Sequence, residues 1–99
     1  MRYIAKHYTE RILVTDMAKM LGLTPSYFGL LFKQETGMTM NQYITRTRIR
    51  NAEHLLRSGQ YQVRDITRIC GFSDNVHFYK QFKALMGIAP SQFIPKRSS

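Results

Sequence analysis

One segment of this chain occurs twice. The sequence GLTPSYFGLLFKQETGMTMNQYI at residues 22–44 returns, with changes, as GFSDNVHFYKQFKALMGIAPSQFI at residues 71–94. The glycines that open the copies, Gly22 and Gly71, are 49 positions apart (71 − 22), whereas the phenylalanines that follow are 50 apart (78 − 28), so one residue is inserted in the second copy. Stacked repeat folds need about three or more copies. Two copies in 99 residues therefore predict a duplicated small module.

The apolar residues of both copies have helical spacing. Three triplets stand at positions i, i+3 and i+4, which predicts one apolar, core-facing side on each of three short helices: Met17, Met20 and Leu21; Phe28, Leu31 and Phe32; Ile66, Ile69 and Cys70. A further short helix is expected at residues 2–9. Hydrophobic residues make up 43% of the chain, with 6 Gly and 3 Pro, and no segment has the pattern of a strand. The predicted fold class is all-α.

A longer helix is predicted at about residues 40–57, between the copies. Its apolar stripe consists of Tyr43, Ile44, Ile49, Ala52, Leu55 and Leu56. Thr39 and Gln42 have the spacing of a capping box at its start, and Gly59 is expected to end it. In the copies, Thr24 and Ser73 are the predicted N-caps and Gly37 and Gly87 the predicted C-caps.

Each copy also has a small residue four positions before its turn glycine. These residues are Ala18 before Gly22 and Thr67 before Gly71. Two helices that cross at about 90 to 120° touch closely, and a small side chain leaves room for that contact. The pattern predicts two helix-turn-helix units, at about residues 14–35 and 63–86.

The charge of the chain restricts its partners. It has 15 Lys and Arg against 6 Asp and Glu, a formal charge of +9. Such a surface favours nucleic acid or an anionic membrane surface, although a basic domain without such a partner is the plain alternative. A single cysteine and no apolar leader indicate a cytoplasmic protein, and no apolar run approaches the roughly 20 residues that span a bilayer.

Three short motifs resemble one known family. They are FKQETG at residues 32–37, RIRNA at residues 48–52 and GFSD at residues 71–74. Over essentially all of residues 1–99 the chain resembles the DNA-binding domain of the AraC/XylS family of bacterial transcription regulators. The resemblance implies seven helices, two helix-turn-helix units joined by a long linker helix, binding to double-stranded promoter DNA, and activation of transcription with RNA polymerase as a partner.

Some members of that family carry an effector or receiver domain before this one. Because the first helix is expected to begin at once, we interpret the chain as the C-terminal part of a longer regulator. A linker helix of about 18 residues is roughly 27 Å long, and major-groove segments on one side of a duplex recur about every 34 Å. The duplication would then act as an intramolecular counterpart of a dimer that reads two half-sites.

Outward positions of the second helix in each unit are the candidate DNA contacts. The candidate base contacts are Ser26, Tyr27 and Leu30 in the first unit and Asn75, Val76, His77 and Lys80 in the second. The candidate phosphate contacts are Thr24, Lys33, Gln34, Arg46, Arg50, Ser73, Tyr79 and Lys83. Gly29 has no side chain, and Leu30 offers only apolar contact to a thymine methyl group. The first unit therefore either reads bases weakly or mainly positions the DNA backbone.

Other kinds of site have little support in the sequence. The histidines and the cysteine lack the spacing of a zinc site, and no catalytic motif stands out, so we expect neither metal, cofactor nor enzymatic activity; these residues are His7, His54, His77 and Cys70. Cys70 is expected to be an inert core residue. The rival interpretation is a basic helical interaction module that binds an acidic partner or a membrane surface.

Overall fold

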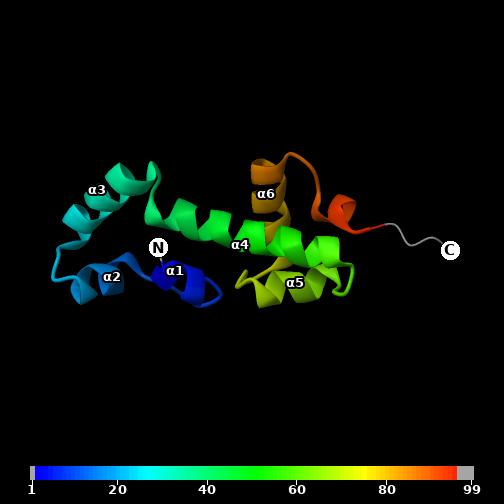
Figure 1. Ribbon diagram of the computed structural model, residues 1–99, viewed down its shortest axis with the longest axis horizontal. Helices are drawn as coiled ribbons and strands as arrows, with labels where there is room; N and C mark the ends of the chain where they lie inside the picture. Colours follow the sequence, from blue (N-terminus) through cyan, green and yellow to red (C-terminus); the bar gives the residue numbers. More distant parts are fainter. Residues whose placement is uncertain (1, 96–99) are drawn as a thin grey trace.

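The computed structural model describes residues 2–95, so the two ends of the predicted 1–99 domain lie outside the described residues. Within this range the chain is an elongated helical molecule of 56 × 22 × 22 Å (Figure 1). Its elements are α1 (Arg2–His7), α2 (Val14–Met20), α3 (Pro25–Thr36), α4 (Met40–Ser58), α5 (Val63–Ile69), α6 (Asn75–Met86) and the 3-10 helix η1 (Pro90–Phe93). The all-α fold class is confirmed. The first helix is shorter than the predicted residues 2–9.

The prediction of seven helices is corrected. The described residues form six α-helices, and the remaining element, η1, is a short 3-10 helix. Pro90 opens η1, and Ile94 after it is extended, with φ −74° and ψ 127°. Pro95 follows directly, and a proline disfavours the α conformation in the residue before it. The segment is therefore too short for an α-helix.

Side-chain caps set the start of three helices. The Thr24 hydroxyl accepts a hydrogen bond from the Tyr27 amide at 3.2 Å. Thr39 accepts from the Gln42 amide at 3.2 Å while the Gln42 side chain accepts from the Thr39 amide at 3.0 Å, which confirms the capping box. The predicted C-caps Gly37, Gly59 and Gly87 are also confirmed.

The prediction of Ser73 as an N-cap is wrong. Asp74 caps α6, and its Oδ1 accepts the His77 amide at 2.7 Å. The one-residue insertion in the second copy moves the cap by one position. A carboxylate also serves this role well, because it satisfies a free amide and lies at the positive end of the helix dipole.

The molecule has two hydrophobic cores that share α4. The first core contains Ile4, Met17, Ala18, Phe28, Phe32, Met40 and Ile44. The second contains Ile49, Ala52, Leu56, Ile66, Cys70, Phe72, Phe78 and Phe82. The N-terminal part of α4 thus covers one core and its C-terminal part the other. The small residues Ala18 and Thr67 are both buried, and the Thr67 hydroxyl is satisfied by the Val63 carbonyl at 3.0 Å.

Three residues expected on core-facing sides are exposed instead. Met20 and Leu21 are each 62% exposed and Ile69 is 42% exposed. The helices α2 and α5 have only seven residues each, and each buries just two of them. Such short helices bury a narrow stripe around Met17 and Ile66, so the next apolar residue in the pattern falls outside it.

Candidate nucleic-acid interface

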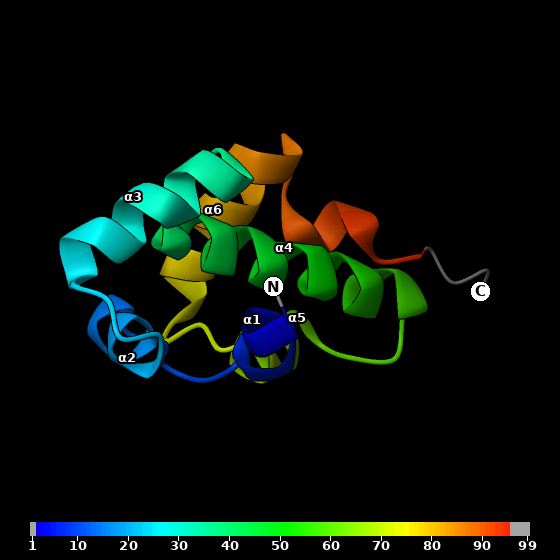
Figure 2. The same cartoon turned by 60° about the vertical axis from the view of Figure 1, so that its left-hand side comes forward.

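The helices α3 and α6 lie on the same side of α4. In Figures 1 and 2 both rise above α4, while α1, α2 and α5 lie below it. Each is the second helix of its helix-turn-helix unit, and each has two buried phenylalanines at matching positions, Phe28 and Phe32 in α3 and Phe78 and Phe82 in α6. This shared inward stripe leaves the opposite side of both helices free.

All predicted contact residues on α3 are exposed. Ser26, Lys33 and Gln34 are exposed, Tyr27 is 51% exposed and Leu30 is 56% exposed. Ser26, Leu30 and Lys33 lie at i, i+4 and i+7, so they share one face of the helix. That face offers a hydroxyl, an apolar side chain and one positive charge.

The matching face of α6 is more polar. Val76, Lys80 and Lys83 occupy the positions equivalent to Ser26, Leu30 and Lys33 at the offset of 50, and all three are exposed. Asn75, His77 and Tyr79 are also exposed and flank this face. Asn can bond adenine with two hydrogen bonds, and Lys can reach a guanine edge. The second unit thus has the hydrogen-bonding groups that the first lacks.

The arginines of α4 divide between two environments. Arg46 and Arg50 are exposed and line the same hollow beside Leu85 and Met86 of α6. Arg48 is half-buried, and burial lowers the pKa of its guanidinium. Successive helical residues turn by about 100°. Arg46 and Arg50, four positions apart, therefore share one side of α4, whereas Arg48, two positions from each, points to the other side. This division leaves Arg46 and Arg50 free for an anionic partner.

Two further arginines were missed by the sequence analysis. Arg64 and Arg68 of α5 are exposed and line one hollow with Ser73 and Asn75 at the start of α6. They lie at i and i+4, and the offset of 49 aligns them with Thr15 and Lys19. This alignment is the sequence signal that could have identified them, because it shows two arginines on the first helix of the second unit where the first unit has Thr15 and Lys19.

Few carboxylates neutralise this surface. In the part of the chain that the structure describes, Arg57 forms an ion pair with Glu53 at 3.8 Å, and the His7 ring contacts the Glu10 carboxylate. The other exposed basic side chains of residues 3–95 therefore contribute to a positive surface that attracts polyanions.

Cys70 is a free, fully buried thiol. Burial raises its pKa to about 11, and the nearby positive charge of Arg48 lowers it only in part. Burial also raises the pKa of the Tyr8 hydroxyl, with a smaller contribution from Cys70. The thiol is therefore protonated at neutral pH and is a core group, as predicted.

No helix among residues 2–95 is long and apolar enough to cross a membrane.

A family profile described as a helix-turn-helix domain matches residues 17–96 of this chain. The Msm operon regulatory protein of Streptococcus mutans is 33% identical over 92 residues, which is 93% of this chain and 33% of that protein. The chain belongs to the AraC/XylS family of bacterial transcription regulators. Its domain is the DNA-binding, transcription-regulating part of such AraC/XylS proteins.

Two more comparisons agree with this membership. The transcriptional activator RhaR of Escherichia coli is 40% identical over 62 residues, 63% of this chain and 22% of that protein. The C-terminal domain of AraT, a response regulator from Geobacillus stearothermophilus, has a TM-score of 0.87 at 26% identity and covers 99% of this chain and 85% of that one. The chain spans about a third of the length of the first AraC/XylS relatives it matches.

Proposed function

We propose that this domain binds specific promoter sequences with α3 and α6 in two successive major-groove segments. The observation that carries the proposal is that both recognition helices, α3 and α6, lie on one side of α4 (Figure 2), and that their contact residues are exposed. The molecule is 56 Å long, and neighbouring groove segments on one side of a duplex lie about 34 Å apart. A single chain is therefore long enough to contact two half-sites.

The two units divide the work of recognition. In α6, Asn75, Val76, His77 and Lys80 contact base edges, whereas α3 has mainly apolar contact through Tyr27 and Leu30 besides the Ser26 hydroxyl. Hydrogen bonds to base edges discriminate among all four base pairs in the major groove, while apolar contact chiefly recognises the thymine methyl group. The half-site under α6 therefore carries the stricter sequence requirement.

The remaining candidate residues hold the phosphates. These are Thr24, Lys33, Gln34, Arg46, Arg50, Ser73, Tyr79 and Lys83, joined by Arg64 and Arg68. Contacts of this kind fix the register of the protein on DNA without reading sequence. If about six phosphates are neutralised, log affinity falls with log salt at a slope near −5.

The decisive experiment is selection of bound sequences from a pool of random duplexes. The expected product has two boxes whose centres are about 10 base pairs apart, with the stronger base preference in one box. A pool that shows no enrichment, or an affinity that does not change with salt, would contradict the proposal. Binding to anionic liposomes without binding to duplexes would favour a basic interaction module instead.

The whole regulator is proposed to activate transcription together with RNA polymerase. One comparison supports this role, because RhaR is named a transcriptional activator. The AraT domain, which is the C-terminal part of a response regulator, supports a preceding domain instead. An effector or receiver domain preceding this one fits the coverage of about a third of the relatives. A promoter fused to a reporter gene, with the selected boxes beside the polymerase site, tests the sign: activation raises reporter output, and a decrease would indicate repression.

A further inference from the structure

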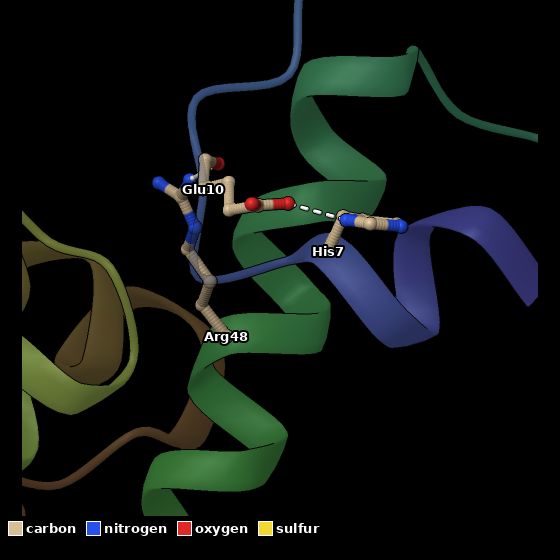
Figure 3. Close-up of polar contacts among 3 residues, drawn as sticks. All are labelled: His7, Glu10 and Arg48. Atoms are coloured by element: carbon tan, nitrogen blue, oxygen red, sulfur yellow. Dashed lines mark hydrogen bonds and ion pairs between the residues drawn. The ribbon is translucent and has the colours of Figure 1, made fainter.

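The segment at residues 8–10 packs against the first core through Tyr8 but contacts the second unit at Gly71. It follows α1, whose Ile4 is part of the first core. The amide of Glu10 donates to the His7 carbonyl at 2.9 Å, and the His7 ring contacts the Glu10 carboxylate (Figure 3). These contacts fold the segment into a defined turn beside α4.

Arg48 of α4 binds the backbone of this segment. Its Nε donates to the Tyr8 carbonyl at 2.6 Å and its Nη2 to the Glu10 carbonyl at 2.9 Å. Figure 3 shows the Arg48 side chain extending from α4 towards Glu10. The guanidinium carbon also lies 5.8 Å from the ring centre of Phe72, which belongs to the second core. One half-buried side chain therefore touches both units. Because two of its donors are used inside the protein, Arg48 is poorly placed to bind DNA phosphate.

Gly71, in the turn of the second unit, meets the same segment at very short range. A Cβ atom at Gly71 would lie 2.7 Å from the Thr9 carbonyl oxygen and 2.9 Å from the Thr9 Cα, closer than packed atoms allow. Gly71 also has φ +90°, in the left-handed region that favours glycine. Gly22 is its equivalent in the first unit, with φ +68°, and a Cβ there would have nothing within 4 Å.

This contact has no counterpart at the turn of the first unit. Cys70, just before Gly71, is fully buried, whereas the equivalent Leu21 is 62% exposed. Tyr8 packs against the first core, while its carbonyl oxygen accepts a hydrogen bond from Arg48. The contact is thus not part of the repeated module. It is a connection between the modules.

Among the described helices, the extensive contacts do not join α1, α2 or α3 directly to α5, α6 or η1. The helices α1 and α3 pack on α4, and α2 packs on α3, while α5, α6 and η1 pack on α4 or on one another. The helix α4 joins the two cores, with Ile44 in the first and Ile49 in the second. Residues 8–10 brace α4 between its two cores, near Ile49 of the second.

We propose that residues 8–10, Arg48 and Gly71 form an inter-unit contact that fixes the angle between α3 and α6, so that Arg48 and Gly71 are positioning residues for binding two half-sites. This inference rests on the proposed two-groove binding. Rigid linkage makes the second binding event intramolecular, and its gain depends on the two sites being held at the right separation. A loose joint keeps each unit intact but loses much of that gain.

The matched variants are Gly71→Ala against Gly22→Ala, and Arg48→Gln against Arg57→Gln. The two glycines share a left-handed backbone, so both alanine variants carry its strain, but only Gly71→Ala collides with Thr9. Arg57 is also on α4, yet it contacts Phe93 within the second unit. Each pair thus separates loss of the inter-unit contact from general destabilisation, which urea unfolding of all four variants quantifies.

Two readouts test the inference. Nitroxide labels on Glu35→Cys and Ala84→Cys, both exposed positions outside the proposed contacts, report the α3 to α6 separation in the DNA-free protein. The distribution of distances between the two labels should be narrow in the parent protein and in the two controls. It should be broad in Gly71→Ala and Arg48→Gln. Affinity for a duplex with both half-sites, divided by affinity for one half-site alone, should fall about tenfold or more in the latter pair and stay unchanged in the controls.

The outcomes separate the two proposals. An unchanged separation in Gly71→Ala and Arg48→Gln, or an equal loss of affinity for one and two half-sites, would overturn the inter-unit contact as a positioning device. Failure of the parent protein to bind the two-half-site duplex more tightly than one half-site would overturn the proposed function, while the label distances would still decide whether the contact holds the units. A ratio that falls in both controls as well would assign the effect to lost stability and overturn the inference.

Discussion

Asn75, Lys80 and Lys83 lie on α6 and have different expected roles in DNA binding. All three are exposed, as the sequence predicted from the inward stripe of Phe78 and Phe82. An amide or ammonium group at a base edge distinguishes base pairs, whereas the same charge at a phosphate does not. Their roles in DNA binding stay predictions that substitution can test.

We predict that Asn75→Ala or Lys80→Ala relaxes the preference at particular bases, at a cost of about 1 to 3 kcal/mol for the preferred sequence. Lys83→Ala should weaken all sequences alike and reduce the salt slope by about one. Competition binding with single-base variants of the selected duplex measures both effects. A uniform loss from all three substitutions would show that the assigned roles are wrong.

The buried thiol of Cys70 gives the fold a dependence on alkaline pH. Its pKa in the folded protein is about 11 against an ordinary value of 9.0, chiefly because burial disfavours the thiolate. A raised pKa means that the folded state holds the proton more tightly. The associated stability is complete below about pH 9 and is lost as pH rises towards 11.

We expect the free energy of unfolding to fall by about 2 to 3 kcal/mol from this group between pH 9 and 11. Urea unfolding at a series of pH values measures the fall, and Cys70→Ala supplies the comparison in which this part of the slope is missing. An identical slope in Cys70→Ala would show that other groups cause the alkaline loss. The native thiol should also react slowly with thiol reagents at neutral pH, because little thiolate is present.

At the scale of helices, α3 and α6 have the same frame and different surfaces. Both are 12 residues long, both end at a left-handed glycine, and both bury two phenylalanines. Their N-caps differ, with the Thr24 hydroxyl in α3 and the Asp74 carboxylate in α6. The frame therefore tolerates different caps and different contact residues while keeping each helix at the same place in its unit.

We predict that Asp74→Ala lowers the free energy of unfolding by about 0.5 to 2 kcal/mol, because the His77 amide loses its partner. Ser73→Ala is the matched control, since the adjacent Ser73 side chain is not the cap, and its unfolding free energy should stay close to that of the parent. Urea unfolding of both variants followed by helix content makes the comparison. A larger loss in Ser73→Ala than in Asp74→Ala would contradict the assignment of the cap.

At the scale of the whole molecule, two cores share one helix. Ile44 is 5% exposed in the first core and Ile49 is 1% exposed in the second, only five positions apart on α4. Each core therefore depends on a different part of the same rod. Local opening of one unit need not open the other, because proteins unfold in separate cooperative units.

Truncation of each isoleucine should weaken mainly its own unit. We predict that Ile44→Ala lowers protection of amide hydrogens chiefly in α3 and Ile49→Ala chiefly in α5 and α6, each at a cost of about 2 to 5 kcal/mol. Hydrogen exchange resolved by residue gives the measurement, with each variant serving as the control for the other. An equal loss across both units in both variants would show a single cooperative core.

The sequence by itself determined the local features. The caps at Thr24 and Thr39, the C-terminal glycines and the inward phenylalanines all follow from interactions between residues a few positions apart, and periodicity and spacing record such interactions directly. The one-residue shift of the cap from Ser73 to Asp74 shows how close this local reading comes and where an insertion defeats it.

The tertiary structure decided what depends on contacts between distant segments. Leu21 and Cys70 are equivalent in the repeat, yet Leu21 is exposed and Cys70 is buried in the second core, and Thr9 lies against Gly71 while nothing lies within 4 Å of a Cβ at Gly22. Likewise Arg48 differs from Arg46 and Arg50 through hydrogen bonds to residues 38 and 40 positions away. A repeat in sequence gives both units the same local energies, and only the packed chain makes their surroundings different.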